Sequence, residues 1–247
     1  KFLEINLSFK CHIEQQEIMD KEIDKILQKV NNRYEFCSNI INDRDLKNII
    51  EIGVYKGEFA EFILKNCISV ENYYMIDPWK NISDWNKPLN IEDSKFEECF
   101  NETILRTNFA SEKRTVLRGK TQEVIKDIPD NSVDLIYIDG EHTLKGITID
   151  LLLSWNKVKD GGIIIGDDFI PSIWHHNLKF EPSFVFPFSI YFAEAMQSKI
   201  YGLPFNQFLI QKLTNGYHFK NLTDVSIYFK QDILNQFKNY LELIKKS

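Results

Sequence analysis

Cysteine patterns typical of disulfide scaffolds and zinc sites are missing from this chain. The four cysteines, Cys11, Cys37, Cys67 and Cys99, lie far apart, with no Cys-x-x-Cys pair and no histidine at zinc-finger spacing. Secreted scaffolds are usually short and dense in cysteine, because disulfides replace the large core that they lack. We therefore expect free thiols and a cytoplasmic protein.

The chain also has no long apolar run and no excess of positive charge. No stretch approaches the roughly 20 apolar residues that a membrane-spanning helix needs, and residues 1–10 lack the order of a signal peptide. The formal net charge is −6 and the pI is about 5.5. Binding a phosphate backbone requires a basic face, so we expect neither a membrane nor a nucleic acid as a partner.

What the chain does contain is a regular alternation of short Ile-rich runs and amphipathic segments. The runs predict five strands, at Asn48–Ile52, Tyr73–Ile76, Arg114–Arg118, Val133–Ile138 and Ile163–Ile165. The segments between them carry apolar residues at helical spacing. This alternation predicts an α/β fold with a parallel sheet and right-handed crossovers.

Three parts of the chain are distinguished by this pattern. Residues 1–45 form an N-terminal helical extension, residues 46–222 the α/β domain, and residues 223–247 a C-terminal helix packed on the same domain. Within the extension, apolar spacing predicts a helix over Ile13–Val30, and the polar stretch Asn31–Asp45 reads as a connector.

The remaining segments are predicted from turn chemistry and apolar spacing. Lys80–Glu92 is a long loop, and such loops are often lids or binding loops. Apolar spacing over Phe188–Tyr201 indicates a helix. Asn215-Gly216 is a strong hairpin signal, which predicts that Phe208–Leu213 pairs with Tyr217–Phe219.

Acidic side chains follow two of the predicted strands. Asp139-Gly-Glu-His142 comes directly after Val133–Ile138, and Asp167-Asp168 comes after the fifth strand. Ligands of parallel sheets bind outside the carboxyl ends of the strands, so both clusters should meet at the working edge. Repulsion between neighbouring carboxylates must be offset there by a cation, a base or a shared proton.

A glycine loop follows the first strand. Glu51-Ile-Gly53-Val-Tyr-Lys-Gly57 places two glycines in a strand-to-helix turn, where a missing side chain lets a ligand approach the backbone. The segment lacks the third glycine of the dinucleotide fingerprint. Asp77 ends the next strand, where an acid can accept hydrogen bonds from ribose hydroxyls.

The glycine loop, Asp77, the five alternating units and the terminal hairpin signal together resemble class I S-adenosylmethionine-dependent methyltransferases. The resemblance covers about residues 48–219. It implies a Rossmann-like sheet of about seven strands with the last strand antiparallel and helices on both faces. It further implies that Gly53 and Gly57 line the methionine end of S-adenosylmethionine, that Glu51 orders the loop, that Asp77 holds the ribose, and that Thr121 faces the adenine.

The acidic clusters look like those of the metal-dependent sugar O-methyltransferase subfamily. This resemblance implies that Asp139, Asp167 and Asp168 bind a divalent metal, and Asp139 then also lies beside the donor. Three carboxylates are the oxygen-rich shell that Mg²⁺ or Mn²⁺ takes. The acceptor implied is the hydroxyl of a sugar or a nucleotide-linked sugar. The simpler alternative is that Asp139 caps the following helix and that Asp167-Asp168 is a solvated loop.

Two residues compete for the role of general base. Glu141 stands two positions after the first predicted ligand, where the resemblance places a base, whereas the unperturbed pKa of His142 lies nearer neutral pH. Two other functions stay open, namely a metal-independent N- or O-methyltransferase and a catalytically silent module that binds S-adenosylmethionine. The amphipathic terminal helices are compatible with a homodimer.

Overall fold

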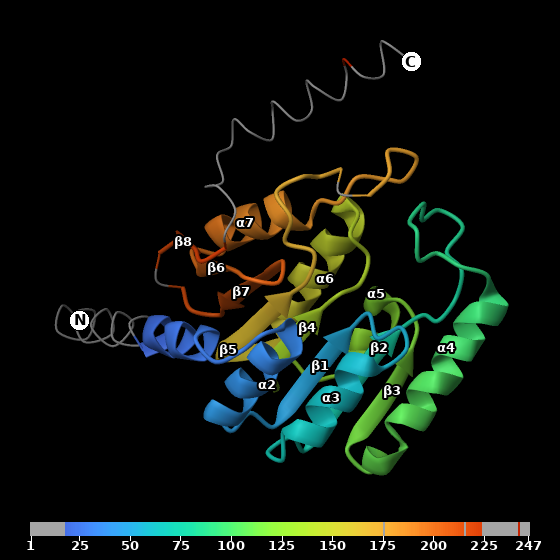
Figure 1. Cartoon of the computed structure of the whole chain (residues 1–247), viewed down its shortest axis with the longest axis horizontal. Helices are drawn as coiled ribbons and strands as arrows, with labels where there is room; N and C mark the ends of the chain where they lie inside the picture. The colour runs from blue at the N-terminus through green and yellow to red at the C-terminus, as the bar shows by residue number, and fades with distance from the viewer. Residues whose placement is uncertain (1–17, 175, 215, 224–241, 243–247) are drawn as a thin grey trace.

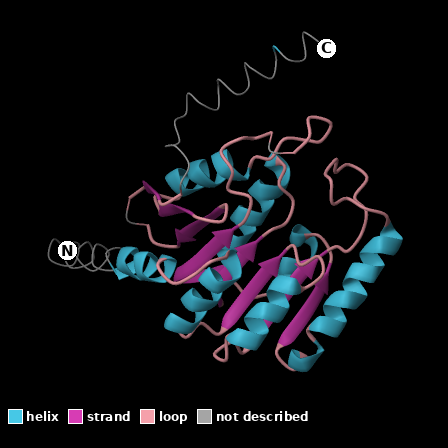
Figure 2. Cartoon of the chain, in the orientation of Figure 1, coloured by secondary structure: helices cyan, strands magenta, loops and turns pink. Residues whose placement is uncertain are grey.

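An eight-stranded mixed sheet forms the centre of the described part of the chain (Figures 1 and 2). The computed structural model describes residues 18–174, 176–214, 216–223 and 242. The strands are β1 (Asn48–Ile52), β2 (Asn72–Asp77), β3 (Arg114–Arg118), β4 (Val133–Ile138), β5 (Val158–Gly166), β6 (Lys199–Leu203), β7 (Gln207–Gln211) and β8 (His218–Asn221).

The sheet order is β3-β2-β1-β4-β5-β7-β6-β8. The first five strands pair in parallel, and β7 runs antiparallel to both of its neighbours, β5 and β6. The predicted Rossmann-like sheet with an antiparallel seventh strand is therefore confirmed. The strand predicted over Tyr217–Phe219 corresponds to β8, but β8 pairs in parallel with β6.

Helices cover both faces of the sheet, as expected. They are α2 (Arg33–Asp43), α3 (Glu58–Asn66), α4 (Asp93–Arg106), α5 (Thr121–Val124), α6 (Leu144–Lys157) and α7 (Val185–Ala195), with 3₁₀ turns η1 (Asn108–Ala110) and η2 (Ile125–Asp127). Figure 1 shows α2 and α3 in front of the sheet and α6 behind it.

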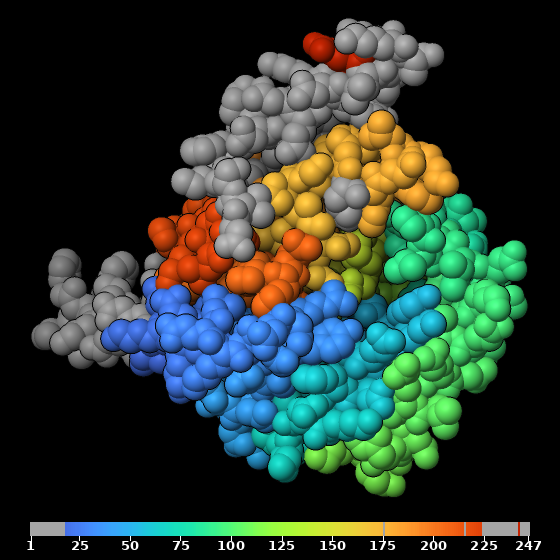
Figure 3. Space-filling view, viewed as in Figure 1, coloured from blue at the N-terminus to red at the C-terminus, as the bar shows by residue number. Residues whose placement is uncertain are grey.

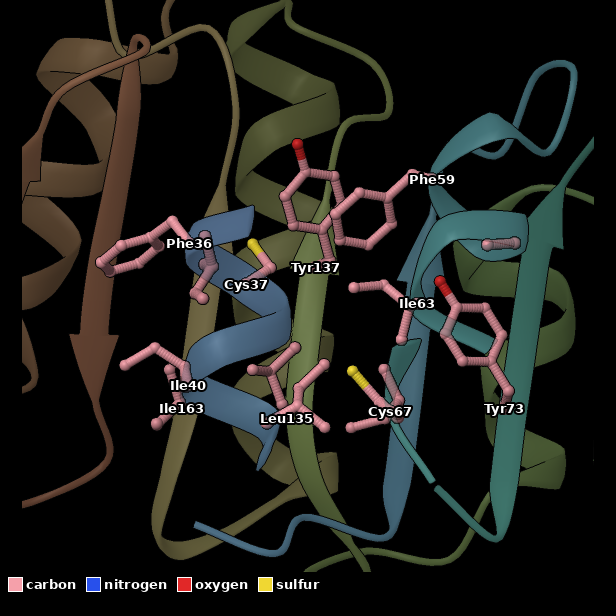
Figure 4. Close-up of a cluster of buried hydrophobic side chains, with 14 of the residues drawn as sticks. Phe36, Cys37, Ile40, Phe59, Ile63, Cys67, Tyr73, Leu135, Tyr137 and Ile163 are labelled. Carbon is pink, nitrogen blue, oxygen red and sulfur yellow. The ribbon is translucent and has the colours of Figure 1, made fainter. Parts of the chain in front are cut away.

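Side-chain alternation along the strands divides the core into two layers. Ile49 of β1 packs in the layer under α2 and α3, and its neighbour Ile50 packs in the layer under α6 and α7. Figure 4 shows the first layer, where Phe59 of α3 stacks on Tyr137 of β4 with ring centroids 4.0 Å apart. Both faces of the sheet are thus sealed, and its carboxyl edge remains for ligands.

The stretch Asn31–Asp45 is not a connector, so that prediction was wrong. Most of it is helix α2, whose N-cap Asn32 accepts a hydrogen bond from the backbone N–H of Glu35 at 2.9 Å. Phe36 and Ile40 lie on its buried face. The polar residues that suggested a connector lie at the helix start and on its outer face, and burial of the apolar face decides the conformation.

Two further predictions are wrong, namely the end of the helix predicted over Phe188–Tyr201 and the strands joined by the hairpin. α7 ends at Ala195, and Lys199–Tyr201 belong to β6 rather than to a helix. The hairpin joins β6 to β7, with Phe205 and Asn206 at positive φ in the turn. The segment after Gly216 forms β8, which adds to the far side of β6 and does not pair with β7. Pairing within the sheet outweighed local turn preference here.

Of the predicted N-terminal helix, residues 18–30 are described and residues 18–27 are helical, and Met19, Ile23 and Ile26 are buried in the core layer of α2. The predicted C-terminal helix lies almost entirely outside the described residues, as does Cys11. The other three cysteines are buried free thiols, as expected. In the described part of the chain, no helix has the length and apolarity that crossing a membrane requires.

Candidate functional site

A cavity of about 390 Å³ opens at the carboxyl edge of the sheet. Its wall includes residues that follow four neighbouring strands, namely Gly53 after β1, Asp77 at the end of β2, Asp139 after β4 and Asp167 after β5. In Figure 3 a recess is visible where the blue, green and yellow segments meet. The cavity lies at the switch point between β1 and β4, where sheets of this order bind ligands.

The glycine loop turns tightly against the loop after β4. Gly53 has φ +86°, and a Cβ at this position would lie 1.9 Å from the carbonyl oxygen of Asp139. Only glycine fits such a close approach between two backbones. The loop therefore presents its backbone, rather than a side chain, to the cavity.

Asp77 holds this loop in place. Its Oδ2 accepts the backbone N–H groups of Val54 and Tyr55, each at 2.9 Å, and its Oδ1 accepts that of Trp79 at 2.7 Å. Burial raises the pKa of Asp77 despite these three donors. A carboxylate has about four acceptor sites, so one remains for a ligand hydroxyl.

Glu51 and Gly57 do not line the cavity. The Glu51 carboxyl is buried beneath the sheet edge, where it accepts the hydroxyl of Tyr73 at 2.7 Å, and burial raises its pKa well above the usual value. Gly57 has φ +73° and precedes α3, and a Cβ there would lie 2.9 Å from Cγ2 of Thr103. Both residues therefore act on the shape of the loop from below.

The predicted metal ligands Asp139, Asp167 and Asp168 all line the cavity, and a cation from α2 pairs with two of them. The Arg33 guanidinium makes a close ion pair with Oδ2 of Asp167 and lies 3.7 Å from Oδ2 of Asp139. The Asp167 side chain is only 7% exposed, so its charge needs a partner. Helix α2 thus contributes directly to the site.

His142 pairs with the third carboxylate. Its Nδ1 lies 2.7 Å from Oδ2 of Asp168, and its Nε2 lies 3.5 Å from Oδ1 of Asp139. Burial alone would lower the pKa of His142, but the two carboxylates outweigh it and raise the pKa to about 9. Both ring nitrogens therefore face acids.

Glu141 lines the same cavity and is oriented by its neighbour. Its Oε1 accepts a short hydrogen bond from the hydroxyl of Thr143. Thr143 is also the N-cap of α6, since its hydroxyl accepts the N–H of Gly146 at 3.1 Å. The alternative that Asp139 caps this helix is therefore wrong.

One cluster among the described residues brings three metal-binding side chains close together. Ligand atoms of His142, Asp168 and His176 all lie within 4.8 Å of one another. Of the three predicted carboxylates, only Asp168 belongs to this cluster; Asp139 and Asp167 line the same cavity and pair with Arg33. The donor chemistry fits a divalent ion, and binding one through Asp167 requires Arg33 to release that carboxylate.

The predicted loop over residues 80–92 and a second loop over residues 176–184 form one wall of the cavity. The loop over residues 80–92 contributes Lys87, which is 5% exposed and donates to the carbonyl oxygens of Glu181 at 2.8 Å and Pro182 at 3.1 Å. Asn86 donates through Nδ2 to the carbonyl of Lys179 at 2.8 Å. The wall, residues 80–92 with 176–184, is therefore one hydrogen-bonded unit.

Sequence reasoning missed two residues of the site, Arg33 and Asp150. A signal existed for the first, since Asn32 and Glu35 have the spacing of a helix start. Asp150 of α6 is 4% exposed and lines the cavity beside Thr121, whose hydroxyl hydrogen-bonds to it. The sequence contained a signal for Asp150 as well, because this acid falls at the helical spacing of Ile147, Leu151 and Ser154, which are buried on the same face of α6.

Comparison with known proteins agrees with this architecture. Residues 50–169 match a family described as a methyltransferase domain. A 143-residue stretch is 25% identical to Uncharacterized protein R132 of Acanthamoeba polyphaga mimivirus, and it spans 57% of this chain and 61% of that protein.

Two solved structures share the fold at low identity. The SAH-bound methyltransferase PaMTH1 of Podospora anserina is 15% identical with a TM-score of 0.53, over 82% of this chain and 87% of that one. An O-methyltransferase from Bacillus cereus in complex with SAH is 14% identical with a TM-score of 0.52, over 81% of this chain and 96% of that one.

The strand order, the glycine loop after β1 and the acid at the end of β2 are those of the class I methyltransferase fold, which the two solved structures share. Residues 50–169 carry the methyltransferase domain of the matched family. The expectation of a class I S-adenosylmethionine-dependent methyltransferase is thereby confirmed.

Proposed function

We propose that this protein transfers the methyl group of S-adenosylmethionine to a hydroxyl of a sugar or a nucleotide-linked sugar, with the help of a divalent metal. The observation that carries the proposal is that one cavity joins the glycine loop and Asp77 to the acidic cluster. A donor bound along the loop can therefore reach an acceptor held at Asp139 and Asp168.

Methyl transfer from a sulfonium is an in-line displacement, and the donor carries its own activation. The protein must align acceptor oxygen, methyl and sulfur, and must remove a proton. The backbone at Gly53 supports the donor, Asp77 keeps an acceptor site for the ribose, and Thr121 lies at the nucleoside end. Glu51 and Gly57 keep the loop in shape from beneath.

A metal at this site would be Mg²⁺ or Mn²⁺, held by Asp139, Asp167 and Asp168. Such an ion lowers the pKa of a coordinated hydroxyl, which a sugar needs near neutral pH. The carboxylates are suitable ligands for hard ions. Arg33 and His142 carry the compensating positive charge in the ligand-free protein.

Glu141 is the better placed of the two candidate bases. Nδ1 of His142 pairs with Asp168, and the pKa of about 9 keeps the ring protonated near neutral pH, so His142 is poorly suited to take a proton from the methyl acceptor. Glu141 lines the cavity, and one of its oxygens remains open after Thr143 has bonded to the other. His142 instead holds Asp168 in position.

The wall opposite the donor suits a sugar. Trp85, Lys87 and His176 line the cavity there, which places an indole ring beside polar and charged groups. Sugars bind well to such surfaces because their C–H faces pack on aromatic rings while their hydroxyls need hydrogen-bond partners.

A cytoplasmic location, a homodimer and the three-part division of the chain remain predictions.

The ion pairs of Arg33 and His142 favour one second candidate, a metal-independent methyltransferase on oxygen or nitrogen. In that case the two protein cations would supply the charge that a metal supplies otherwise. Chelation separates the two candidates.

Dialysis against EDTA is expected to reduce methylation of a panel of nucleotide-linked sugars to background, and Mg²⁺ or Mn²⁺ should restore it. The measurement is transfer of labelled methyl from S-adenosylmethionine. Donor binding, followed by calorimetry with S-adenosylhomocysteine, should survive the treatment because Gly53 and Asp77 are not metal ligands. Full activity after chelation would establish the metal-independent candidate instead.

Replacing Arg33 should strengthen metal binding. In Arg33→Gln we expect Mn²⁺ to bind about tenfold more tightly than in the wild type, because two unit charges 4 Å apart repel by about 1 to 4 kcal/mol in water or near a protein surface. Titration calorimetry measures the affinity directly, without turnover.

The matched control is Arg106→Gln, which removes an arginine that pairs with Glu61 and Glu102 outside the cavity. Its Mn²⁺ affinity should equal that of the wild type. Equal affinities for Arg33→Gln and the wild type would contradict competition between Arg33 and the metal.

A further inference from the structure

Asp150 is a buried acid in the cavity wall that the proposed mechanism does not use. It lies on α6, nearly two turns after the loop that carries Glu141 and His142, and it is 4% exposed. Its carboxyl fits against Gly140, where a Cβ would lie 2.8 Å from Oδ2 of Asp150. A polar group buried this deeply in a ligand cavity needs partners, and the ligand can supply one.

The position of Asp150 along the cavity indicates which part of the ligand it meets. The acidic cluster follows β4 and β5, and Asp77 ends β2. A donor whose sulfonium faces the acidic cluster and whose ribose reaches Asp77 extends its base toward the end of β3. The residues there are Gly119 and Thr121, and Thr121 hydrogen-bonds to Asp150.

The chemistry of the carboxyl suits an amino-substituted base. A carboxyl group accepts hydrogen bonds in either protonation state, and the exocyclic amine of adenine is a donor. Burial, opposed by the hydrogen bond from Thr121, raises the pKa of Asp150 to about 7, so the neutral form can also donate to a ring nitrogen. An adenine edge offers this donor and acceptor side by side.

We infer that Asp150, together with Thr121, recognises the exocyclic amine of the donor adenine and sets the specificity of the nucleoside site. The inference rests on the proposed function, in which S-adenosylmethionine is the methyl donor. Asp150 would contact this donor and not the methyl acceptor. Asp150 is therefore a specificity-determining residue for the donor.

The test compares two ligands, S-adenosylhomocysteine and its N6,N6-dimethyl derivative, which lacks the N–H donors and carries extra bulk. Calorimetry should show that the wild type prefers the unmodified ligand by about 100-fold. Asp150→Ala should lose about 10- to 100-fold in affinity for the unmodified ligand, because a buried hydrogen bond contributes about 1 to 3 kcal/mol when its partner is left unpaired. Its preference should fall below about tenfold, because the smaller side chain leaves room for the methyl groups.

Asp150→Asn keeps an acceptor oxygen at the same place and should retain the preference of the wild type. If Asp150→Ala does not fold, Asp150→Asn is a sufficient test by itself. Loss of the preference for the unmodified ligand in Asp150→Asn would overturn the role of the acceptor oxygen. An equal loss of affinity for both ligands in Asp150→Ala, with an unchanged ratio, would likewise overturn the inference. Failure of the wild type to bind S-adenosylhomocysteine would instead remove the donor assignment.

Discussion

Glu141→Gln should lower kcat by about 100- to 10,000-fold, the usual contribution of a general base. The amide keeps the shape of the side chain and can still accept the hydroxyl of Thr143, but it cannot take a proton. Affinity for the donor should not change, because Glu141 stands on the acceptor side of the cavity. Steady-state kinetics with a saturating acceptor, together with calorimetry of S-adenosylhomocysteine, measure the two quantities separately.

Glu112→Gln is the matched control, since Glu112 is exposed and lies in a turn outside the cavity. It should retain wild-type kcat. A Glu141→Gln enzyme with kcat within about threefold of the wild type would exclude Glu141 as the base. In that event His142, the alternative raised by the sequence, would need to release its bond to Asp168 before accepting a proton.

Asp150→Asn should stabilise the ligand-free protein above neutral pH. Burial raises the pKa of Asp150 in the folded protein to about 7, against an ordinary value of 3.8 for an aspartate. Because the folded pKa is the higher one, the wild type loses stability as pH rises from about 4 through 7. With about 1.36 kcal/mol per pKa unit, the loss is about 4 kcal/mol at pH 8. The groups that act on this carboxyl are Thr121 and His142, which favour its charged form, and Glu141, which opposes it.

The difference in free energy of unfolding between Asp150→Asn and the wild type should therefore be small near pH 4.5 and reach its full value above pH 7. Urea denaturation at a series of pH values measures it, provided that the slope m stays constant. Asp127→Asn, at an exposed site, should show no such trend. A variant that is less stable than the wild type at pH 8 would contradict a buried carboxyl that resists ionisation.

The sheet and the acidic clusters were predictable because the Ile-rich runs are too short for helices and are bounded by Asp or Gly, which is typical of buried strands. The contribution of Arg33 was not. Its helix start could be read from Asn32 and Glu35, but no local pattern reveals that residue 33 reaches an acid after β5. The same limit explains β6, since residues 199–201 fit a helix or a strand equally well and only pairing with β7 decides.

Asp150 shows a related limit. An acid at a buried helical position looks like an interruption of the apolar pattern, and its meaning appears only when the cavity beside it is known. Glu51 shows the opposite case, because it belongs to the glycine motif while its side chain accepts a hydrogen bond from Tyr73 and does not line the cavity. Motif membership therefore indicates a neighbourhood and does not establish contact.

The wall of residues 80–92 and 176–184 has a consequence for how this protein can diversify. Its two segments bond to each other through Asn86 and Lys87, and neither contributes a strand to the sheet. Insertions or substitutions in these loops can therefore alter the acceptor while the donor half of the cavity stays intact. The methyl acceptor can therefore change through these two loops while the sheet and the donor site are kept.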